Sequence, residues 1–383
     1  MKGNLVLNII WYGLATLFLI LFARELWGLW QKKTKKRAAQ ISRLIIFLIL
    51  MVLSLIPGLL FPPHEPLVVT GTYKTGMVRY TYVDSQRMEP YSHDDENRKV
   101  NVVFWYPETS DENETFPLIV FSHGGLGTET SNESLFLELA SHGYVVCSIG
   151  HPYHALYTKS EEGKITFVSS EYFNEIQRED AKTNKQQSYN YYQKWLGLRT
   201  ADINFVINTI LEKTTNDEDG VYGLIDETKI GLIGHSLGGS AVLAIPRQRD
   251  DIDVVIALES PFLFDIIGVE NGAFVWLEDT YPIPVLNIYS DSSWSNLSLW
   301  SQYARNASLI SEPPETAISL HFSGAGHFSL TDLALVSPRL TRFLEKGLSN
   351  DDPESYLRKV NQACLEFLDL YLKNIGSLEK IKQ

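Results

Sequence analysis

Two long uncharged stretches near the amino terminus set the strongest limit on what this chain folds into. They run from Leu5 to Phe22 and from Leu44 to Phe61, and each holds eighteen residues without a charged side chain. A helix needs about 20 mostly apolar residues to cross the hydrocarbon core of a bilayer. We therefore expect two transmembrane helices, with spans at about residues 5–22 and 44–61.

The segment between these stretches carries most of the positive charge of the region. Only Lys2 precedes the first stretch, and no Lys or Arg follows the second until Lys74, whereas the intervening basic residues include Lys32, Lys33, Lys35, Lys36, Arg37 and Arg43. Short basic loops stay in the cytoplasm. Residues 1–61 are therefore predicted to form a hairpin whose loop, 31–43, is cytoplasmic, so that the rest of the chain is extracytoplasmic. A signal peptide is the alternative, but no small-residue cleavage pattern follows the first stretch.

The chain beyond the hairpin is strongly acidic. Residues 62–383 hold 25 Lys or Arg and 45 Asp or Glu, a net charge of −20, against −13 for the whole chain. Such a surface repels the phosphates of nucleic acids and of anionic lipids. We therefore expect no nucleic-acid partner, and we expect the hairpin, not surface charge, to hold the protein at the membrane.

After a linker at residues 62–72, apolar runs of strand length alternate with helical patterns. Strands are predicted at 99–107, 117–125, 144–150, 229–234, 253–259, 284–290 and 317–323, and the main helices at 132–143, 191–213 and 237–245. This alternation is typical of a mostly parallel sheet flanked by helices. The sequence thus predicts one α/β domain over residues 73–383, with the polar, aromatic-rich stretch 151–192 as a candidate cap.

The stretch "GLIGHSLGGSA" contains the pattern Gly-x-Ser-x-Gly. Ser236 stands between Gly234 and Gly238, directly after a predicted strand and before a predicted helix. Glycines at these places allow the sharp turn, called a nucleophile elbow, that exposes a serine hydroxyl. Ser236 is therefore the candidate nucleophile. The alternative is that it only caps the helix while the glycines allow close packing.

A nucleophilic serine needs a base to take its proton, and in this arrangement an acid and then a histidine follow it in the chain. Of nine histidines, only His321 and His327 follow Ser236. His321 falls inside a predicted strand, whereas His327 follows that strand on a glycine-flanked loop, so we expect His327 to be the base. Glu259 and Asp291 each stand at the predicted carboxyl edge of the sheet, and their spacing does not decide which is the acid.

An oxyanion hole in this arrangement uses two backbone N–H groups. One is expected from Leu237, directly after the serine. The other is expected from the loop "SHGGLG", at Gly125, or at Leu126 if the turn is one residue longer. A phosphate-binding loop is excluded there, because the segment lacks the Gly-Lys-Ser/Thr ending and a basic residue.

No metal or organic cofactor is expected. His151 and His154 are close enough in the sequence to resemble a metal-binding pair, but no third ligand clusters with them. The chemistry expected of Ser236 also needs neither.

Six segments in this order, "VFSHGGLG", "LASHGYVV", "GHPYHA", "KIGLIGHSLGGS", "IALES" and "GAGHFSLTD", resemble the platelet-activating-factor acetylhydrolase family. These are α/β-hydrolases, serine esterases that remove short acyl groups from phospholipids and related esters. The resemblance extends from about Val100 to the last helix and implies an α/β-hydrolase fold after the two-helix transmembrane hairpin.

Carried over by position, the resemblance implies that Ser236 is the nucleophile, His327 the base and Glu259 the acid. The family normally has aspartate where this chain has Glu259, so Asp291 remains the alternative acid. The segment "HGGLG" also has one glycine more than the family's His-Gly-Leu-Gly. The second oxyanion donor therefore stays open between the two residues named above.

Together these observations predict a membrane-anchored serine hydrolase that cleaves carboxylic esters, short-chain or phospholipid-like, through an acyl-enzyme at Ser236. Two alternatives remain at this stage. One is a catalytically silent α/β-hydrolase fold that serves as an extracytoplasmic binding module. The other is an acyltransferase that uses the same serine, histidine and acid.

Overall fold

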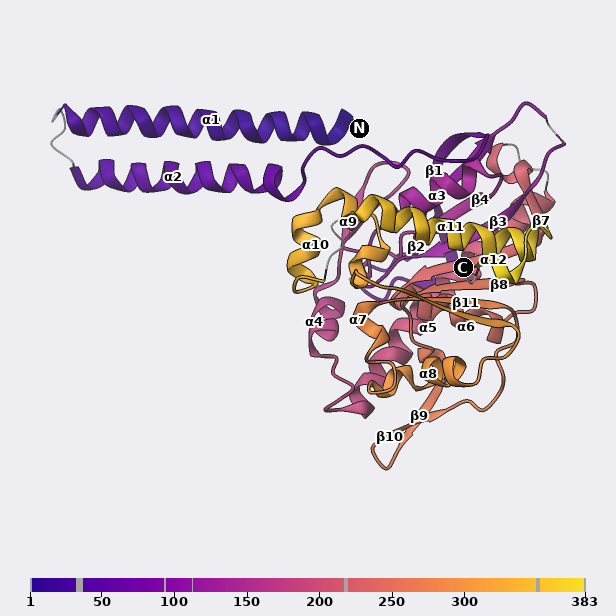
Figure 1. Ribbon diagram of the computed structural model, residues 1–383. Helices are drawn as coiled ribbons and strands as arrows, with labels where there is room; N and C mark the ends of the chain where they lie inside the picture. Colours follow the sequence, from indigo (N-terminus) through magenta and orange to yellow (C-terminus); the bar gives the residue numbers. More distant parts are fainter. Residues whose placement is uncertain are drawn as a thin grey trace.

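A computed structural model describes residues 2–31, 37–92, 94–111, 113–216, 220–348 and 352–381. Two long helices lie side by side and project from a layered α/β domain (Figure 1). The domain has an eight-stranded, mostly parallel sheet with helices on both faces, which confirms the fold class predicted from the sequence.

All the strands and main helices predicted from the alternating pattern are present, together with further strands and helices. The strands are β1 (Lys74–Met88), β2 (Asn97–Glu108), β3 (Phe116–Ser122), β4 (Val145–Ile149), β5 (Tyr157–Lys159), β6 (Ile165–Phe167), β7 (Ile225–His235), β8 (Val254–Leu258), β9 (Ile266–Glu270), β10 (Ala273–Trp276), β11 (Val285–Ser290) and β12 (Ala317–Phe322). The α-helices are α1 (Lys2–Trp30), α2 (Arg37–Leu60), α3 (Glu133–Ser141), α4 (Ser170–Arg178), α5 (Lys185–Thr215), α6 (Leu237–Ala244), α7 (Asp291–Trp294), α8 (Ala304–Ser311), α9 (Leu333–Val336), α10 (Pro338–Leu344), α11 (Pro353–Leu372) and α12 (Leu378–Ile381). A short 3₁₀ helix, η5 (His327–Leu330), follows β12.

The main sheet has the strand order β1-β2-β4-β3-β7-β8-β11-β12. β1, β2 and β4 pair antiparallel, and every pair from β4 to β12 is parallel. β7 therefore lies inside the sheet, between β3 and β8. Because parallel strands end at one edge, the segments that follow β3, β7, β8, β11 and β12 meet there, where sites form in sheets of this kind.

Two apolar cores cover the two faces of the sheet. Alternate residues of each strand enter opposite cores, as the period-2 geometry of a strand requires: Phe104 packs with α5 and α6, whereas Trp105 packs with α3 and α11. The parallel strands β3, β4 and β8 are buried along their whole length, which is why they read as continuous apolar runs in the sequence.

The structure also contains strands that the pattern did not predict. β1 is a long edge strand in which Met77, Val83 and Met88 are exposed while Asp84 is buried, so its apolar residues do not alternate with its burial. β9 and β10 form a separate two-stranded hairpin, and β5 and β6 another, within the stretch 151–192. The stretch then continues through α4 into the first turns of α5.

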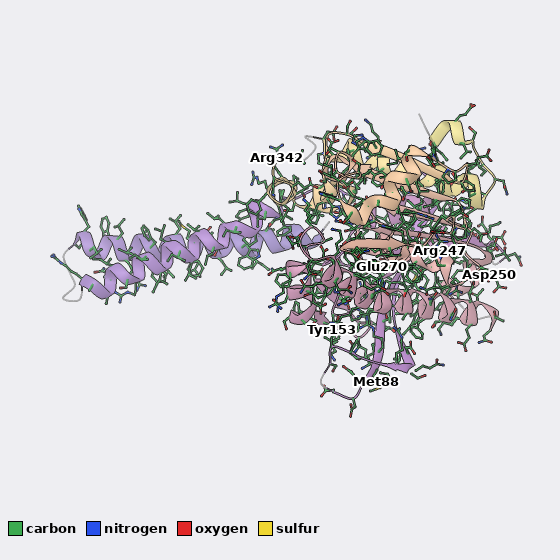
Figure 2. All side chains as sticks on the ribbon, turned by 90° about the horizontal axis from the view of Figure 1, so that it is seen from below. Met88, Tyr153, Arg247, Asp250, Glu270 and Arg342 are labelled. Carbon is green, nitrogen blue, oxygen red and sulfur yellow. The ribbon has the colours of Figure 1, made fainter. Side chains whose placement is uncertain are left out.

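Helices α1 and α2 form an antiparallel pair whose apolar side chains project outward (Figure 2). By length and composition, residues 8–30 and 37–60 are each long and apolar enough to cross a membrane. Polar contacts join the pair at both ends: Arg43 forms an ion pair with Glu25, and the Asn8 amide donates to the carbonyl of Phe61. Residues 32–36, which hold the four lysines of the expected loop 31–43, lie outside the described residues.

The end of α2 contacts the domain through α10. The Ser337 hydroxyl donates to the carbonyl of Leu60, and the Arg339 guanidinium donates to the carbonyl of Leu59 at 3.0 Å. Arg342, also on α10, lies on the side of the domain from which the helices project, whereas Asp250 lies on the far side (Figure 2). The hairpin is thus attached to the domain close to η5.

Candidate active site

Ser236 occupies a sharp turn between the central strand β7 and helix α6. Its backbone has φ 54° and ψ −123°, a conformation that residues other than glycine rarely adopt. Its N–H donates to the carbonyl of Leu258 at 2.9 Å. Such strain persists only where the surroundings hold it in place, and it clusters at functional sites. The turn is the nucleophile-elbow geometry expected from the sequence pattern.

The glycines around Ser236 are required by close backbone contact. A Cβ on Gly234 would lie 2.5 Å from the backbone of Gly238, and a Cβ on Gly238 would lie 2.0 Å from the carbonyl oxygen of Ser122. Neither position has room for any side chain. The spacing Gly-x-Ser-x-Gly is thus the local condition for packing α6 against β3 directly behind the serine.

His327 begins η5, at the same edge of the sheet. Its N–H donates to the Ser292 hydroxyl at 2.9 Å, and its carbonyl accepts from Nε2 of His235, the residue before Ser236, at 3.1 Å. The two imidazole rings are 4.5 Å apart between centroids. The loop that carries His327 is therefore bound directly to the turn that carries Ser236.

Two carboxylates surround this loop. Glu259 follows β8 with φ 52°, is 1 % exposed, and has Oε2 3.9 Å from Nδ1 of His327. The same oxygen accepts the N–H of Ser290 at 3.1 Å. Burial lowers the pKa of His327, and the negative charge of Glu259 opposes that shift.

Asp291, the alternative acid, is engaged elsewhere. Its carboxylate lies 2.7 Å from Nε2 of His321 and accepts the N–H of Gly324 at 2.8 Å. The His321 ring stacks on Trp294, with centroids 4.6 Å apart and planes 4° from parallel. Of the two histidines considered as base, the structure thus pairs His321 with Asp291 and places His327 beside Glu259.

Glu345, at the end of α10, holds the loop after His327. Its carboxylate accepts the N–H groups of Phe328 and Ser329 and the Ser329 hydroxyl. A Cβ on Gly326 would lie 2.6 Å from this carboxyl group, so the loop and the carboxylate fit closely. No sequence pattern predicts this contact, because it joins residues from two separate elements.

The loop after β3 lies against Ser236. A Cβ on Gly124 would be 3.3 Å from Cβ of Ser236. The loop closes as a turn in which the N–H of Gly127 donates to the carbonyl of Gly124 at 3.1 Å, and Leu126 has φ 62°. The N–H of Leu126 donates to the carbonyl of His154, so this group is already used. On the far side of Ser236, the N–H of Leu237 lies at the first turn of α6, where backbone donors lack helical partners.

Arg199 binds the same loop from α5. Its guanidinium donates to the carbonyl of His123 and, at 3.2 Å, to that of Gly124. The side chain is fully buried, and burial lowers its pKa. Arg199 falls inside the helix predicted at 191–213 and was not among the candidate site residues.

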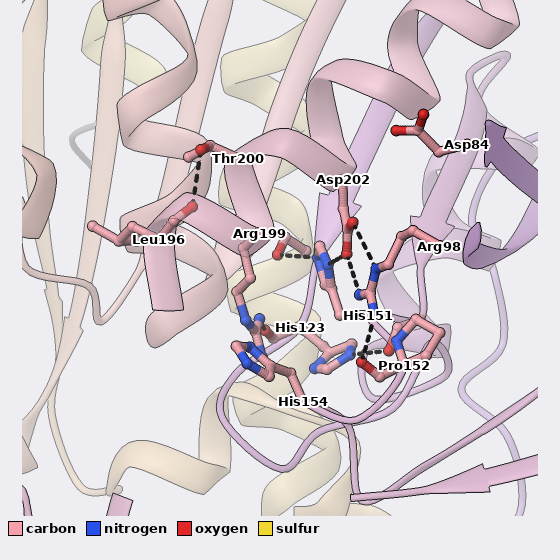
Figure 3. Close-up of polar contacts among 12 residues, drawn as sticks. Asp84, Arg98, His123, His151, Pro152, His154, Leu196, Arg199, Thr200 and Asp202 are labelled. Carbon is pink, nitrogen blue, oxygen red and sulfur yellow. Dashed lines mark hydrogen bonds and ion pairs between the residues drawn. The ribbon is translucent and has the colours of Figure 1, made fainter. Parts of the chain in front are cut away.

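One turn along α5, Asp202 anchors a second buried network. It accepts from Arg98 at 2.7 Å and lies 3.0 Å from Nδ1 of His151, whose Nε2 is 2.9 Å from the Ser122 hydroxyl (Figure 3). All four side chains are fully buried. Burial lowers the pKa of His151 to about 4, and Arg98 keeps the pKa of Asp202 well below its usual range.

The two histidines considered as a metal pair have different partners in the structure. His151 bonds within the network just described, and the ring of His154 stacks on Tyr172, with centroids 3.8 Å apart. His154 also lies 3.0 Å from the Tyr91 hydroxyl. Each imidazole therefore has its own set of protein contacts.

The aromatic residues in and just after the stretch 151–192 differ in burial. Tyr172 and, beyond the stretch, Trp195 are buried and pack edge to face, whereas Tyr157 and Phe173 are exposed. A Cβ on Gly125 would meet the Tyr172 hydroxyl at 3.4 Å and Ile176 Cδ1 at 3.5 Å. Helix α4 thus borders the loop beside Ser236.

Comparisons with known proteins identify the family and the fold of the chain. Residues 70–376 match the family described as "Platelet-activating factor acetylhydrolase, isoform II". The chain is 23% identical over 270 residues to "Platelet-activating factor acetylhydrolase" of Cavia porcellus, an alignment that covers 68% of this chain and 58% of that protein. It is 25% identical over 225 residues to "Cutinase est2" of Thermobifida alba, covering 59% of this chain and 56% of that one.

Among solved structures, a ferulic acid esterase from Streptomyces cinnamoneus has the same fold. Its TM-score is 0.59 with 18% sequence identity, and the match covers 83% of this chain and 96% of the esterase. The curated relatives are matched over little more than half of their length. The resemblance seen in the sequence is confirmed over most of the chain: it belongs to the platelet-activating factor acetylhydrolase, isoform II, family.

Proposed function

We propose that this protein is a membrane-anchored serine hydrolase that cleaves carboxylic esters through an acyl-enzyme at Ser236. The observation that carries the proposal is the strained backbone of Ser236, φ 54°, at the edge of the sheet where the Gly124 loop and the His327 loop converge. The names of its relatives, which include acetylhydrolases and cutinases, point to ester hydrolysis as well.

In this proposal, His327 takes the proton of the Ser236 hydroxyl as the serine attacks the ester carbonyl. Burial lowers the pKa of His327, so the imidazole is neutral and able to accept a proton near pH 7. Glu259, 3.9 Å from Nδ1, orients the ring and stabilises the imidazolium that forms. The protonated histidine then supplies the leaving alcohol with a proton, and water releases the acyl group by the same steps.

The negative charge on the carbonyl oxygen is met by two backbone donors, Gly125 and Leu237. Gly125 is favoured over Leu126 because the N–H of Leu126 already donates to the carbonyl of His154. One donor of this kind is typically worth about 3 kcal/mol of transition-state stabilisation. His235 helps to hold the nucleophile and the base together, since its Nε2 donates to the carbonyl of His327 and so joins the Ser236 turn to the His327 loop.

Among carboxylic esters, short acyl groups are the first candidates, because the relatives include acetylhydrolases. Tyr172 and Ile176 of α4, in the cap that residues 151–192 form in this proposal, lie beside Gly125 and are placed to contact the acyl group. A panel of p-nitrophenyl esters of increasing acyl length tests this: we expect kcat/KM to fall as the acyl chain lengthens, and a maximum at long chains would contradict it.

The hairpin anchors the domain on the extracytoplasmic side. α1 and α2 expose apolar side chains along their length, and their surface needs a lipid environment. Labelling with a membrane-impermeant maleimide in intact cells tests this topology. The native cysteines, Cys147 and Cys364, are buried and should give little background labelling. Asp250→Cys should react and Gln31→Cys should react only after lysis; the reverse pattern would overturn the topology.

Ester hydrolysis itself is tested with purified protein and p-nitrophenyl acetate. Wild type should turn over the ester, and Ser236→Ala should lose turnover while keeping its melting temperature. A folded wild type without turnover on any ester would favour a silent binding module. Release of p-nitrophenol that depends on an added alcohol acceptor would instead favour acyl transfer.

A further inference from the structure

We infer that Arg199 is a positioning residue that sets the direction of the oxyanion-hole donor at Gly125. The inference rests on the proposed function, and it concerns a residue on α5 that does not touch the reacting atoms. Three features support it: the carbonyl groups that the Arg199 guanidinium binds, the planar trans geometry of the peptide after Gly124, and the pairing of Asp202 with Arg98.

The Arg199 guanidinium contacts the backbone of the loop after β3. Arg199 donates to two consecutive carbonyl oxygens, those of His123 and Gly124. In a trans peptide the C=O and the following N–H point in opposite directions. Holding the Gly124 carbonyl toward α5 therefore turns the N–H of Gly125 away from α5, which is the orientation that an oxyanion donor beside Ser236 needs.

The peptide group between Gly124 and Gly125 keeps one orientation only if hydrogen bonds restrain its rotation. Gly124 and Gly125 lack Cβ atoms, so the peptide group between them rotates at low steric cost. A rotated peptide would present its carbonyl oxygen, not an N–H, to the developing negative charge. Two other groups contact the same carbonyl, the N–H of Gly127 at 3.1 Å and Nδ1 of His123 at 2.7 Å. Arg199 adds a charged donor, and it also holds the His123 carbonyl one peptide earlier.

The buried positive charge of Arg199 has no carboxylate of its own among its hydrogen-bond partners in the described residues. A fully buried guanidinium is costly unless it is paired and hydrogen-bonded. The nearby carboxylate of Asp202 is bound by Arg98 through both oxygens, at 3.1 and 2.7 Å, and by His151 at 3.0 Å (Figure 3). Arg98 thus compensates Asp202, which leaves the Arg199 donors directed at the loop carbonyls.

The site of action is close to the nucleophile. A Cβ on Gly124 would be 2.9 Å from Nδ1 of His235 and 3.3 Å from Cβ of Ser236. A small rotation of this peptide would therefore move the donor relative to the serine. Loss of Arg199 should slow the chemical step far more than it weakens substrate binding.

The first test compares Arg199→Lys with wild type, with turnover expressed per active site titrated by a fluorophosphonate. Lysine keeps the charge but cannot bind two carbonyls in the same planar geometry. We expect kcat to fall roughly 10- to 100-fold with KM changed less than about threefold. A trifluoromethyl ketone, whose adduct places an oxyanion in the hole, should lose affinity by the same factor as kcat/KM.

Arg247→Lys is the matched control. Like Arg199, Arg247 donates to two backbone carbonyls, those of Thr280 and Asp279. It differs in also binding the carboxylate of Asp265, and it lies away from the hairpin side (Figure 2). It should keep wild-type kcat per titrated site. Wild-type kcat per titrated site in Arg199→Lys, or an equal loss in the control, would overturn the inference.

A double-mutant cycle tests the route through Gly125. With Leu126 at φ 62°, the turn has the form in which proline fits at the preceding position, so Gly125→Pro removes the N–H with little change of backbone. If Arg199 acts through that N–H, Arg199→Lys should lower kcat in wild type but not further in Gly125→Pro. Independent, multiplied losses would contradict it, and Arg199→Gln replaces the lysine variant if that one does not fold.

These outcomes separate the inference from the proposed function. If wild type is not labelled by the fluorophosphonate, the proposed function fails and the role of Arg199 fails with it. If wild type is labelled and the Arg199 variants turn over normally, only the role of Arg199 fails.

Discussion

The carboxylate of Glu259 lies 3.9 Å from Nδ1 of His327, while the carboxylate of Asp291 lies 2.7 Å from Nε2 of His321. Both acids stand at the carboxyl edge of the sheet, but each faces a different imidazole. Glu259 is buried and follows β8, and its position at φ 52° directs its longer side chain back toward the His327 loop. This arrangement supports Glu259 as the acid of the proposed triad.

The first prediction compares Glu259→Gln with Asp291→Asn. Glu259→Gln should lower kcat roughly 10³- to 10⁴-fold, since loss of the triad carboxylate leaves the imidazole unsupported and its cation unstabilised. Asp291→Asn should change kcat less than about fivefold. Steady-state kinetics with p-nitrophenyl acetate decides the matter, and a collapse of turnover in Asp291→Asn alone would show that the other carboxylate is the acid.

The second prediction concerns pH. The base must be neutral to accept a proton, so kcat/KM should rise with pH through the pKa of His327 and level off above it. Burial lowers that pKa, so the half-maximum should lie below 6.5. In Glu259→Gln the charge that raises the pKa is gone, and the half-maximum of the residual activity should move to still lower pH. An upward shift in the variant would contradict this electrostatic assignment.

The third prediction concerns Glu345, which accepts three hydrogen bonds from the residues after His327. Glu345→Ala should lower the free energy of unfolding by about 1–3 kcal/mol, because it leaves buried donors unpaired. It should also lower kcat, since the His327 loop loses its support.

Glu354→Ala is the control for Glu345→Ala. Glu354 is exposed, and its ion pair with Arg358 is of the surface type that contributes little. Denaturant unfolding should place this control within about 0.5 kcal/mol of wild type. Equal stability of the two variants would show that the Glu345 contacts do not hold the loop.

The fourth prediction uses two glycines. Gly238→Ala should prevent folding or abolish activity, because its Cβ would lie 2.0 Å from the Ser122 carbonyl oxygen. Gly197→Ala, at an exposed position inside α5 with no atom within 4 Å of the new Cβ, should stabilise the protein by about 0.5–1 kcal/mol. Thermal unfolding measures both, and a tolerated Gly238→Ala would show that the elbow is not held as tightly as described.

The sequence was most informative where local rules suffice. The continuous apolar runs of β3, β4 and β8 predicted buried parallel strands, and the glycine spacing around Ser236 predicted the turn that the structure contains. By contrast, β1 was missed because Met77 and Val83 are exposed and Asp84 is buried in this edge strand, so its sequence does not follow the expected alternation. The small β9–β10 hairpin is too short to stand out from the loops around it.

The support of the site could not be predicted, because it depends on residues far apart in the chain. Arg98 and Asp202 are 104 positions apart, and Glu345 reaches back to Ser329 from another helix. A charged residue on the apolar face of α5 is the one local hint. Arg199 and Asp202 lie one turn apart there, among buried aliphatic positions, where an unpaired charge is not tolerated.

The most direct test of the central claim is peptide mapping by mass spectrometry after reaction with a fluorophosphonate. Wild type should carry one adduct per chain, on the peptide that contains Ser236, and the rate of labelling should fall sharply in His327→Ala. Ser236→Ala should remain unlabelled although folded. An adduct on another serine, or a folded wild type that does not react, would contradict the account.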